Sequence, residues 1–238
     1  MFDYSDSHQV PGKGEDYDRD LETSPLSMYL WRKEQLILEG WLKELDSTRS
    51  ALDFAAGTGR ISVFLSQRFD RVLALDISQA MLELVPTKDA TIEPVCADFR
   101  LNPEAVAGPF DVVTAFRFFP NAQPDLRVSA LDFIASRVRI GGLFIVNNHQ
   151  NASSFLFRIG RLLKKTWANS ALENEGLIRE VEQHGFQLEE AVGMGVLPGS
   201  ARRIFLPPVI HSAADSISST VGLDVQWGQN VLMRFRRS

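Results

Sequence analysis

Short apolar segments alternate with segments of helical periodicity through the middle of the chain, from about residue 50 to residue 150. Apolar segments of this length, separated by amphipathic helices, are typical of a parallel sheet that helices cover on both faces. We therefore expect an α/β fold with five parallel strands in this region. The expected strands are residues 51–55, 72–75, 92–96, 111–116 and 142–147, and the expected helices are residues 60–68, 78–85 and 125–138.

The pattern is less regular on both sides of this region. Residues 1–23 are polar and predict a flexible arm, and Ser24 with Pro25 begins a helix that we expect to reach Leu45 with a break at Gly40. Two helices and two strands are expected after the fifth strand, with a further short helix in a long insertion between those two strands. The expected helices are residues 153–165 and 175–184, and the expected strands are residues 186–192 and 230–236. The short helix in the insertion is expected at residues 213–221.

This pattern predicts one main domain with an N-terminal addition. We expect an arm and a cap helix over residues 1–47 and the main domain over residues 48–238. Lid insertions are expected near residues 150–175 and 196–228, because long irregular stretches inside a compact domain are usually functional or disordered. The arm and the cap helix are expected to cover the molecule on which the protein acts.

Composition limits the classes of protein to which the chain can belong. Hydrophobic residues make up 45% and charged residues 23% of the sequence, as in soluble globular domains. The net charge of −5 and the pI near 5.4 argue against nucleic acid as the main partner. A single cysteine, Cys96, excludes an intrachain disulfide, and the polar, acidic N-terminus lacks signal-peptide character, so we expect a cytoplasmic protein. No apolar run approaches the roughly 20 residues that span a bilayer, so stable membrane insertion is not expected.

The segment between the first expected strand and the first expected helix has the features of a ligand-binding loop. Gly57 and Gly59 allow a sharp turn and close approach of a ligand to the main chain. A dinucleotide-binding loop would have a third glycine at position 62, where the chain has Ser62. Asp53 precedes the loop, and its carboxylate would repel a pyrophosphate but attract a ligand that carries an ammonium group and a sulfonium group.

Two further acidic residues follow the next two strands. Asp76 ends the second strand, where an acid can accept hydrogen bonds from ribose hydroxyl groups. Because Ser78 follows it, Asp76 could instead cap a helix. Asp98 follows the third strand and could accept a hydrogen bond from an adenine amino group, with the aromatic ring of Phe99 against the base.

In this order, these residues resemble the class I S-adenosylmethionine-dependent methyltransferases, and within them the bacterial enzymes that act on small molecules. The resemblance covers roughly residues 48–195 and the last strand, and includes Phe110-Asp111-Val112-Val113, Gly141-Gly142 and Gly185-Phe186. It implies a Rossmann-like, mostly parallel sheet of seven strands, with helices on both faces, one antiparallel strand, an N-terminal helical cap, and insertions after strands 5 and 6.

The resemblance also implies S-adenosyl-L-methionine as the cofactor and assigns residues to its parts. Asp53 and the loop of Ala55, Gly57 and Gly59 would face the methionine end, Asp76 the ribose, and Asp98 with Phe99 the adenine. Ile77 and Phe116 complete the expected cofactor-binding set. Ala55 departs from the glycine that many relatives have at this position.

The acceptor of the methyl group is expected over the fourth and fifth strands. Arg117 ends the fourth strand and could contact an anionic acceptor, and His149 follows the fifth strand and could take a proton from the acceptor. Arg117 could equally be an ordinary surface arginine, a histidine in a polar loop such as His149 usually has no catalytic role, and no metal ligands are expected. The basic helix at residues 153–165 could pack on the domain as a lid or lie on a membrane surface.

We therefore expect methyl transfer to a small-molecule acceptor that the sequence does not identify. The alternatives are an NAD(P)-dependent oxidoreductase and a non-catalytic S-adenosylmethionine-binding regulatory protein. A nucleic-acid methyltransferase is disfavoured by the net charge and by Phe116-Arg117-Phe118-Phe119-Pro120, which stands where nitrogen methyltransferases of nucleobases tend to have Asn/Asp-Pro-Pro-Tyr/Phe. The oligomeric state stays open.

Overall fold

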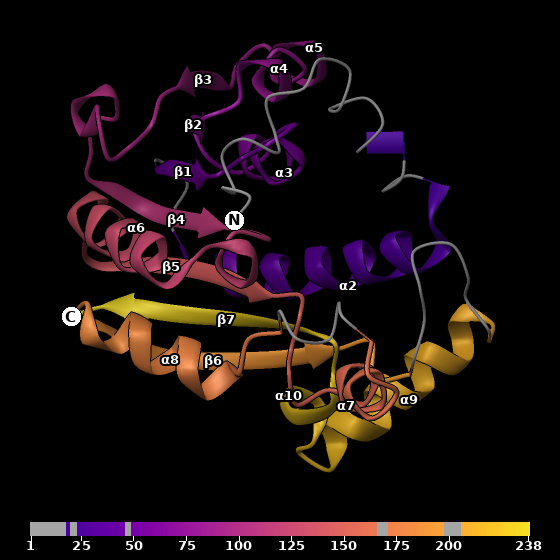
Figure 1. Cartoon of the computed structure of the whole chain (residues 1–238). Helices are drawn as coiled ribbons and strands as arrows, with labels where there is room; N and C mark the ends of the chain where they lie inside the picture. The colour runs from indigo at the N-terminus through magenta and orange to yellow at the C-terminus, as the bar shows by residue number, and fades with distance from the viewer. Residues whose placement is uncertain (1–17, 20–22, 46–48, 166–170, 198–205) are drawn as a thin grey trace.

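A seven-stranded sheet forms the centre of the molecule, in the order β3-β2-β1-β4-β5-β7-β6 (Figure 1). The computed structural model describes residues 18–19, 23–45, 49–165, 171–197 and 206–238. The strands are β1 (Ser50–Phe54), β2 (Arg71–Asp76), β3 (Glu93–Cys96), β4 (Phe110–Ala115), β5 (Val138–Asn148), β6 (Phe186–Met194) and β7 (Asn230–Arg237). The first five strands run parallel, and β7 is antiparallel to both of its neighbours. The expected α/β fold, with one antiparallel strand in a mostly parallel sheet, is confirmed.

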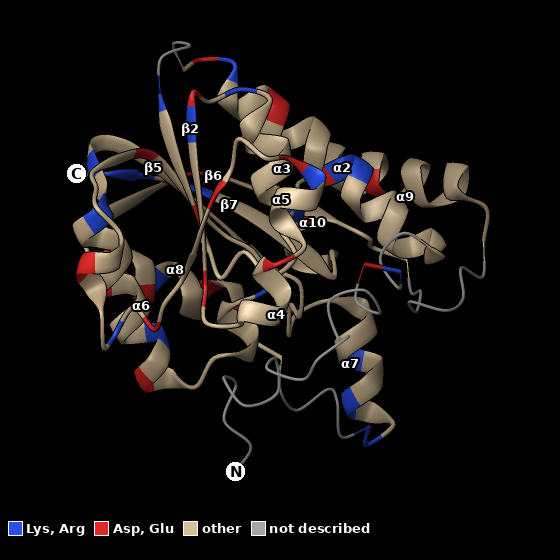
Figure 2. Cartoon of the chain, turned by 90° about the horizontal axis from the view of Figure 1, so that it is seen from above, with Lys and Arg blue, Asp and Glu red and all other residues tan. Residues whose placement is uncertain are grey.

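Helices cover both faces of this sheet, as Figure 2 shows in a view from above. The helices are α2 (Pro25–Leu42), α3 (Arg60–Ser66), α4 (Gln79–Leu82), α5 (Val85–Lys88), α6 (Pro124–Arg137), α7 (Phe155–Leu162), α8 (Asn174–Gln183), α9 (Pro208–Thr220) and α10 (Asp224–Trp227). Buried side chains of α6 and α8 share one hydrophobic core with the sheet, and those of α2 and α3 share the other. Strand β1 contributes to both cores, because Leu52 and Phe54 point to one face and Ala51 to the other.

Helix α2 belongs to the core of the molecule. Ser24 caps it by accepting a hydrogen bond from the Ser27 backbone N–H, and Pro25 occupies its first turn. The break expected at Gly40 is wrong, since the helix continues to Leu42. An exposed helical glycine costs only about 1 kcal/mol, and burial of Trp41 and its neighbours outweighs that cost.

Several element boundaries differ from those expected. The helix expected at residues 78–85 is two short helices, because Pro86 lacks the N–H that would continue the hydrogen bonds of α4 and instead fits the first turn of α5. Strand β5 begins at Val138 and continues past Gly141, which has a φ of 75°. An irregularity in the pairing of β4 with β5 accommodates this longer strand.

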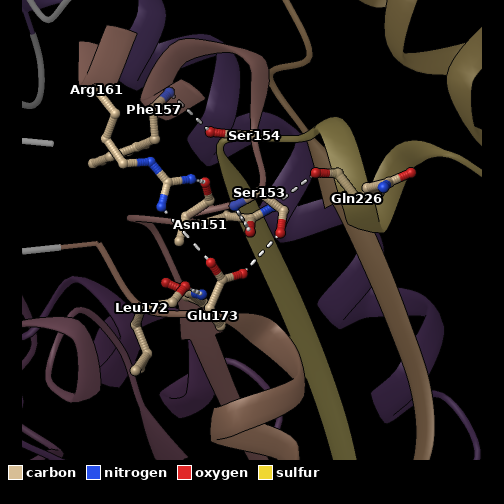
Figure 3. Close-up of polar contacts among 10 residues, drawn as sticks. Asn151, Ser153, Ser154, Phe157, Arg161, Leu172, Glu173 and Gln226 are labelled. Carbon is tan, nitrogen blue, oxygen red and sulfur yellow. Dashed lines mark hydrogen bonds and ion pairs between the residues drawn. The ribbon is translucent and has the colours of Figure 1, made fainter. Parts of the chain in front are cut away.

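The segment after β5 is held to α8 and α10 by polar contacts (Figure 3). The Asn151 side-chain amide donates to backbone carbonyls of α10 and the turn after it, at distances of 2.7 to 3.2 Å. Ser153 donates to Glu173, and Glu173 also forms an ion pair with Arg161 of α7. These contacts position the start of α7 and, with it, the loop that carries His149.

Helix α7 is shorter than the expected basic helix of residues 153–165. Phe157 and Gly160 are buried, but the large apolar side chains of Phe155, Leu162 and Leu163 are exposed. The interpretation that its apolar side chains pack on the domain is therefore wrong for most of them. Within the described residues, no helix combines the length and apolar character that a membrane span requires.

Helix α9 connects the insertion after β6 to helix α2. The Tyr29 hydroxyl donates a hydrogen bond of 2.6 Å to the buried carboxylate of Asp215. The same carboxylate accepts hydrogen bonds from the backbone N–H groups of Gly195 and Val196. Asp215 therefore joins α9 both to α2 and to the segment that follows β6. Burial, followed by the contact with Asp215, raises the pKa of Tyr29 well above its usual value. Residues 198–205 of the insertion, and residues 1–17 and 20–22 of the expected arm, lie outside the described residues.

Candidate functional site

A cavity of about 210 Å³ opens at the carboxyl ends of the parallel strands. It is lined by residues from the ends of β1, β2, β4 and β5 and from the segment after β3, where ligands bind in open α/β sheets. The structure brings together all but one of the residues singled out from the sequence. The residues that line the cavity are Asp53, Ala55, Gly57, Asp76, Ile77, Asp98, Phe99, Phe116, Arg117 and His149. Gly59 lies outside the cavity and begins helix α3.

The loop after β1 has three residues in left-handed backbone conformations. Gly57 has a φ of 56°, and a methyl group added there would meet nothing within 4 Å. Gly59 has a φ of 80°, and an added methyl group would lie 2.8 Å from Val85, so close packing requires this glycine. Ala55 has a φ of 57°, which costs an L-residue roughly 1–2 kcal/mol and explains why glycine is common at this position.

Asp53 is buried at the base of the cavity. Its carboxylate accepts hydrogen bonds from Ser62 at 2.6 Å and Thr114 at 2.8 Å. Burial raises the pKa of Asp53 from its usual 3.8 to about 6, and the two hydroxyl donors only partly offset that effect. Ser62, where a dinucleotide-binding loop would have glycine, therefore holds this carboxylate in place. A cation beside Asp53 would favour its charged form.

Asp76 both supports the glycine loop and lines the cavity. One carboxylate oxygen accepts from the backbone N–H of Gly57, and the other from the backbone N–H of Ser78, each at 2.8 Å. Ser78, and not Asp76, stands at the N-cap of α4, so these contacts support the glycine loop and the turn before the helix and do not cap the helix.

The segment after β3 forms a further wall of the cavity, next to β2. The Asp98 carboxylate accepts from the Arg100 guanidinium at 2.7 and 3.0 Å, which is the main reason that its pKa lies below the usual range. Phe99 packs against Phe54 and Phe133, with ring centroids 5.1 and 5.3 Å apart. Phe99 therefore joins the hydrophobic core to the cavity wall.

The other half of the cavity carries Arg117, Asn121 and His149. Arg117 has a φ of 59°, and its backbone N–H donates to the Asn147 side chain at 2.7 Å. Burial, then the Arg117 charge and then the Arg60 charge lower the pKa of His149 to about 3. This imidazole is therefore neutral across the physiological pH range.

Sequence reasoning missed a buried carboxylate next to this half of the cavity. Glu34 of α2 forms an ion pair with Arg60 at 3.2 Å and accepts hydrogen bonds from Asn230 at 2.7 Å and Asn147 at 3.4 Å. Asn147 in turn holds the backbone of Arg117. The available signal was the position of Glu34 on the apolar face of α2, four residues before the buried Leu38, where an unpaired charge would be costly.

A second contact missed from the sequence links the N-terminal segment to the glycine loop. Asp18 accepts a hydrogen bond of 2.5 Å from the Thr58 hydroxyl and forms an ion pair with Lys88, also at 2.5 Å. Lys88 donates to the Thr58 backbone carbonyl at 2.8 Å. In the described part of the chain, no group of three or more His, Cys, Asp or Glu side chains is placed to hold a metal ion.

Comparisons with known proteins agree with this geometry. Residues 51–142 match a family model described as a methyltransferase domain. The cypemycin N-terminal methyltransferase of a Streptomyces species is 35% identical over 99 residues. That match covers 40% of this chain and only 39% of the relative's length.

Solved structures match over almost the whole chain. The magnesium protoporphyrin IX methyltransferase from Synechocystis, with bound S-adenosylhomocysteine, has a TM-score of 0.65 and 14% identity, covering 98% of this chain and 97% of its own. The N-methyltransferase NodS from Bradyrhizobium japonicum, also with S-adenosylhomocysteine, has a TM-score of 0.61 and 14% identity, covering 94% and 97%. At these identities, the likeness establishes the fold.

Proposed function

This chain belongs to the class I S-adenosylmethionine-dependent methyltransferases, and we propose that it transfers the methyl group of S-adenosylmethionine to a small-molecule acceptor. The observation that carries this proposal is the pairing of a glycine loop with the carboxylates of Asp53 and Asp76 in one cavity. Two carboxylates beside the loop suit a ligand that carries positive charge and no phosphate. They oppose the pyrophosphate of a dinucleotide.

The cavity residues fit the parts of this cofactor. Asp53, with its raised pKa and its position below the loop, would hold the methionine ammonium, together with main-chain groups of Ala55 and Gly57. Open space at Gly57 leaves room for the ligand. Gly59 contributes indirectly, because it allows α3 to begin where it does.

The remaining cofactor contacts are proposed along β2, β3 and β4. Asp76 and Ile77 would hold the ribose, Asp98 and Phe99 the adenine, and Phe116 the region near the sulfur. Because Arg100 already occupies part of the Asp98 carboxylate, the hydrophobic wall that includes Phe99 would contribute most of the contact with the adenine.

The protein's part in methyl transfer is mainly to align its two ligands. The cofactor, when bound, supplies an activated methyl group on a positively charged sulfur. Holding an acceptor in line with that group converts a bimolecular reaction into an effectively unimolecular one. The acceptor half of the cavity, with Arg117, Asn121 and His149, would provide this alignment.

Calorimetry and a transfer assay test this proposal together. We expect micromolar binding of S-adenosylmethionine and of S-adenosylhomocysteine, with NAD binding at least about 100-fold weaker. Transfer of a labelled methyl group into a small-molecule extract would distinguish an enzyme from a binding protein. Tight NAD binding without a response to S-adenosylmethionine would contradict the proposal, and binding without any transfer would favour the regulatory alternative.

A further inference from the structure

The acceptor half of the cavity differs chemically from the cofactor half. The cavity carboxylates belong to the ends of β1 and β2 and to the segment after β3, namely Asp53, Asp76 and Asp98. The ends of β4 and β5 contribute Arg117 and His149, and Arg60 of α3 also lines the cavity. Because the strand order is β3-β2-β1-β4-β5, Asp76 and Asp98 lie at one end of the cavity and Arg117 and His149 at the other. Arg60 lies between them, since its charge acts on both Asp53 and His149.

A chain of hydrogen bonds fixes the proton on the His149 ring. The Asn121 amide nitrogen donates to the backbone carbonyl of Arg117 at 2.7 Å, which orients its Oδ1 as an acceptor. The Gln150 amide nitrogen donates to that oxygen at 2.9 Å and lies 3.2 Å from His149 Nε2. An amide nitrogen only donates, so His149 Nε2 is an acceptor and the hydrogen of the neutral ring lies on Nδ1.

The Nδ1–H group of His149 is a donor that requires an acceptor. Nδ1 is buried and has no hydrogen-bond partner within the described residues, although a buried polar group without a partner is costly. The charged groups that act on this ring are Arg117 and Arg60, and together with burial they lower its pKa to about 3. A base this weak accepts little of a substrate's proton near neutral pH.

We propose, resting on the methyltransferase function proposed above, that the acceptor group is a carboxylate bound by His149 Nδ1–H and the Arg117 guanidinium, and that the product is a methyl ester. One carboxylate oxygen forms a bond to the methyl carbon as the carbon–sulfur bond breaks, and the electron pair of that bond stays on sulfur. The carboxylate charge and the sulfonium charge both disappear, and no proton is exchanged. The reaction therefore needs no base.

An amine acceptor fits this half of the cavity less well. An amine is mostly protonated at neutral pH and would have to lose a proton before attack. The guanidinium group of Arg117 opposes the approach of an ammonium group, whereas the charge of Arg60 is already paired with Glu34. A carboxylic acid is already ionised at this pH, and guanidinium groups bind it in a suitable geometry.

Nuclear magnetic resonance of the complex with S-adenosylhomocysteine tests the binding mode without an acceptor of known identity. With labelled histidine, we expect His149 to keep its proton on Nδ1 from about pH 5 to pH 8, the His149→Asn variant identifying its signal. Acetate should shift this signal, and methylammonium should not. Arg117→Gln should weaken acetate binding at least about tenfold. As a control, Arg71→Gln removes an exposed guanidinium at the start of β2, the end of this strand away from the cavity. This substitution should change the dissociation constant of acetate less than about twofold.

The chemistry of the methylated product tests the reaction itself. Label transferred from S-adenosylmethionine into an extract should be released as volatile methanol by mild alkali, as expected of an ester. Label that resists alkali, or a signal of His149 that responds to methylammonium and not to acetate, would overturn the inference while leaving methyl transfer intact. A complex that responds to neither ion would also overturn it. Absence of all transfer, with acetate still bound, would instead contradict the proposed function.

Discussion

The Glu34 carboxylate accepts a hydrogen bond of 2.7 Å from the side-chain amide of Asn230, so the first long helix is joined to the last strand in the chain. Glu34 also pairs with Arg60, and through Asn147 it reaches the backbone of Arg117. One buried carboxylate therefore anchors helix α2 and holds both the Arg60 side chain and, through Asn147, the backbone of Arg117.

Replacing Glu34 by alanine should destabilise the fold. Removing one partner of a buried ion pair costs about 3–5 kcal/mol, because the other charge is left uncompensated. The Glu34 side chain is 2% exposed and that of Arg60 is 17% exposed, so we expect a loss near the lower end, about 3 kcal/mol, in urea unfolding. Glu39→Ala on the same helix is the control, because Glu39 is 43% exposed and its pair with Arg68 should contribute less than about 1 kcal/mol. Equal stability of the two variants would mean that the Glu34 contacts contribute little.

Replacing Asp76 by alanine should weaken cofactor binding. Hydrogen bonds to a charged group contribute roughly 1.5–3 kcal/mol each, so the loss of the proposed ribose contacts should raise the dissociation constant at least about tenfold. The substitution also removes the hydrogen bonds that Asp76 accepts from the backbone N–H groups of Gly57 and Ser78, so stability should fall modestly. Calorimetry with S-adenosylhomocysteine measures the change, and Asp70→Ala, exposed just before β2, is the control. Unchanged affinity in a folded Asp76→Ala protein would remove Asp76 from the site.

The sequence predicted the central sheet because local pattern and tertiary burial agree there. Strands such as β1 are buried on both faces, and the glycines of the loop between β1 and α3 mark its left-handed turns. Where burial is decided by distant partners, prediction failed. Gly40 looked like a helix break, and only the packing of Leu38 and Trp41 explains why α2 continues.

The same limit applies to the candidate site. The cavity residues could be predicted because each lies at the end of a strand or in the segment that follows it, and parallel strands end at one edge of a sheet. The roles of Glu34 and Asp18 depend on partners 196 and 40 residues away, which no local pattern specifies. The proton position on His149 depends on Gln150 and Asn121, and the orientation of those amides appears only in the folded structure.

The contact of Asp18 with Thr58 predicts that the N-terminal segment affects cofactor binding. We expected this segment to cover only the acceptor, but Asp18 and Lys88 hold Thr58 beside Gly57. Asp18→Ala and Lys88→Ala should each weaken cofactor binding several-fold, and the double variant should lose less than the sum, with a coupling energy of about 0.5–1.5 kcal/mol. A double-mutant cycle tests this prediction, with the cofactor affinity of the native protein, the two single variants and the double variant measured by calorimetry. Additive losses would show that the pair does not act as a unit.

Asp53 should make stability and cofactor affinity depend on pH in opposite directions. Burial raises the pKa of Asp53 to about 6, so between about pH 4 and pH 6 the folded protein binds this proton more tightly than the unfolded chain. Stability from this group is therefore present below pH 4 and is lost as the pH rises through 6, by at most about 3 kcal/mol. Other carboxyl groups, such as Asp111, have lowered pKa values and act in the opposite direction, so the informative quantity is the difference between the native protein and Asp53→Asn.

The Asp53→Asn variant isolates both effects. It should be more stable than the native protein above pH 6 and should lose its advantage towards pH 4, because asparagine can still accept a hydrogen bond from Ser62 or Thr114 without a buried charge. Affinity of the native protein for S-adenosylmethionine should rise up to about tenfold from pH 5 to pH 7, as the Asp53 carboxylate becomes charged and attracts the ammonium group. The variant should bind more weakly at pH 7 and show a flatter pH profile. Parallel binding profiles for the two proteins would mean that Asp53 does not contact a cationic group of the cofactor and serves only to hold Ser62 and Thr114.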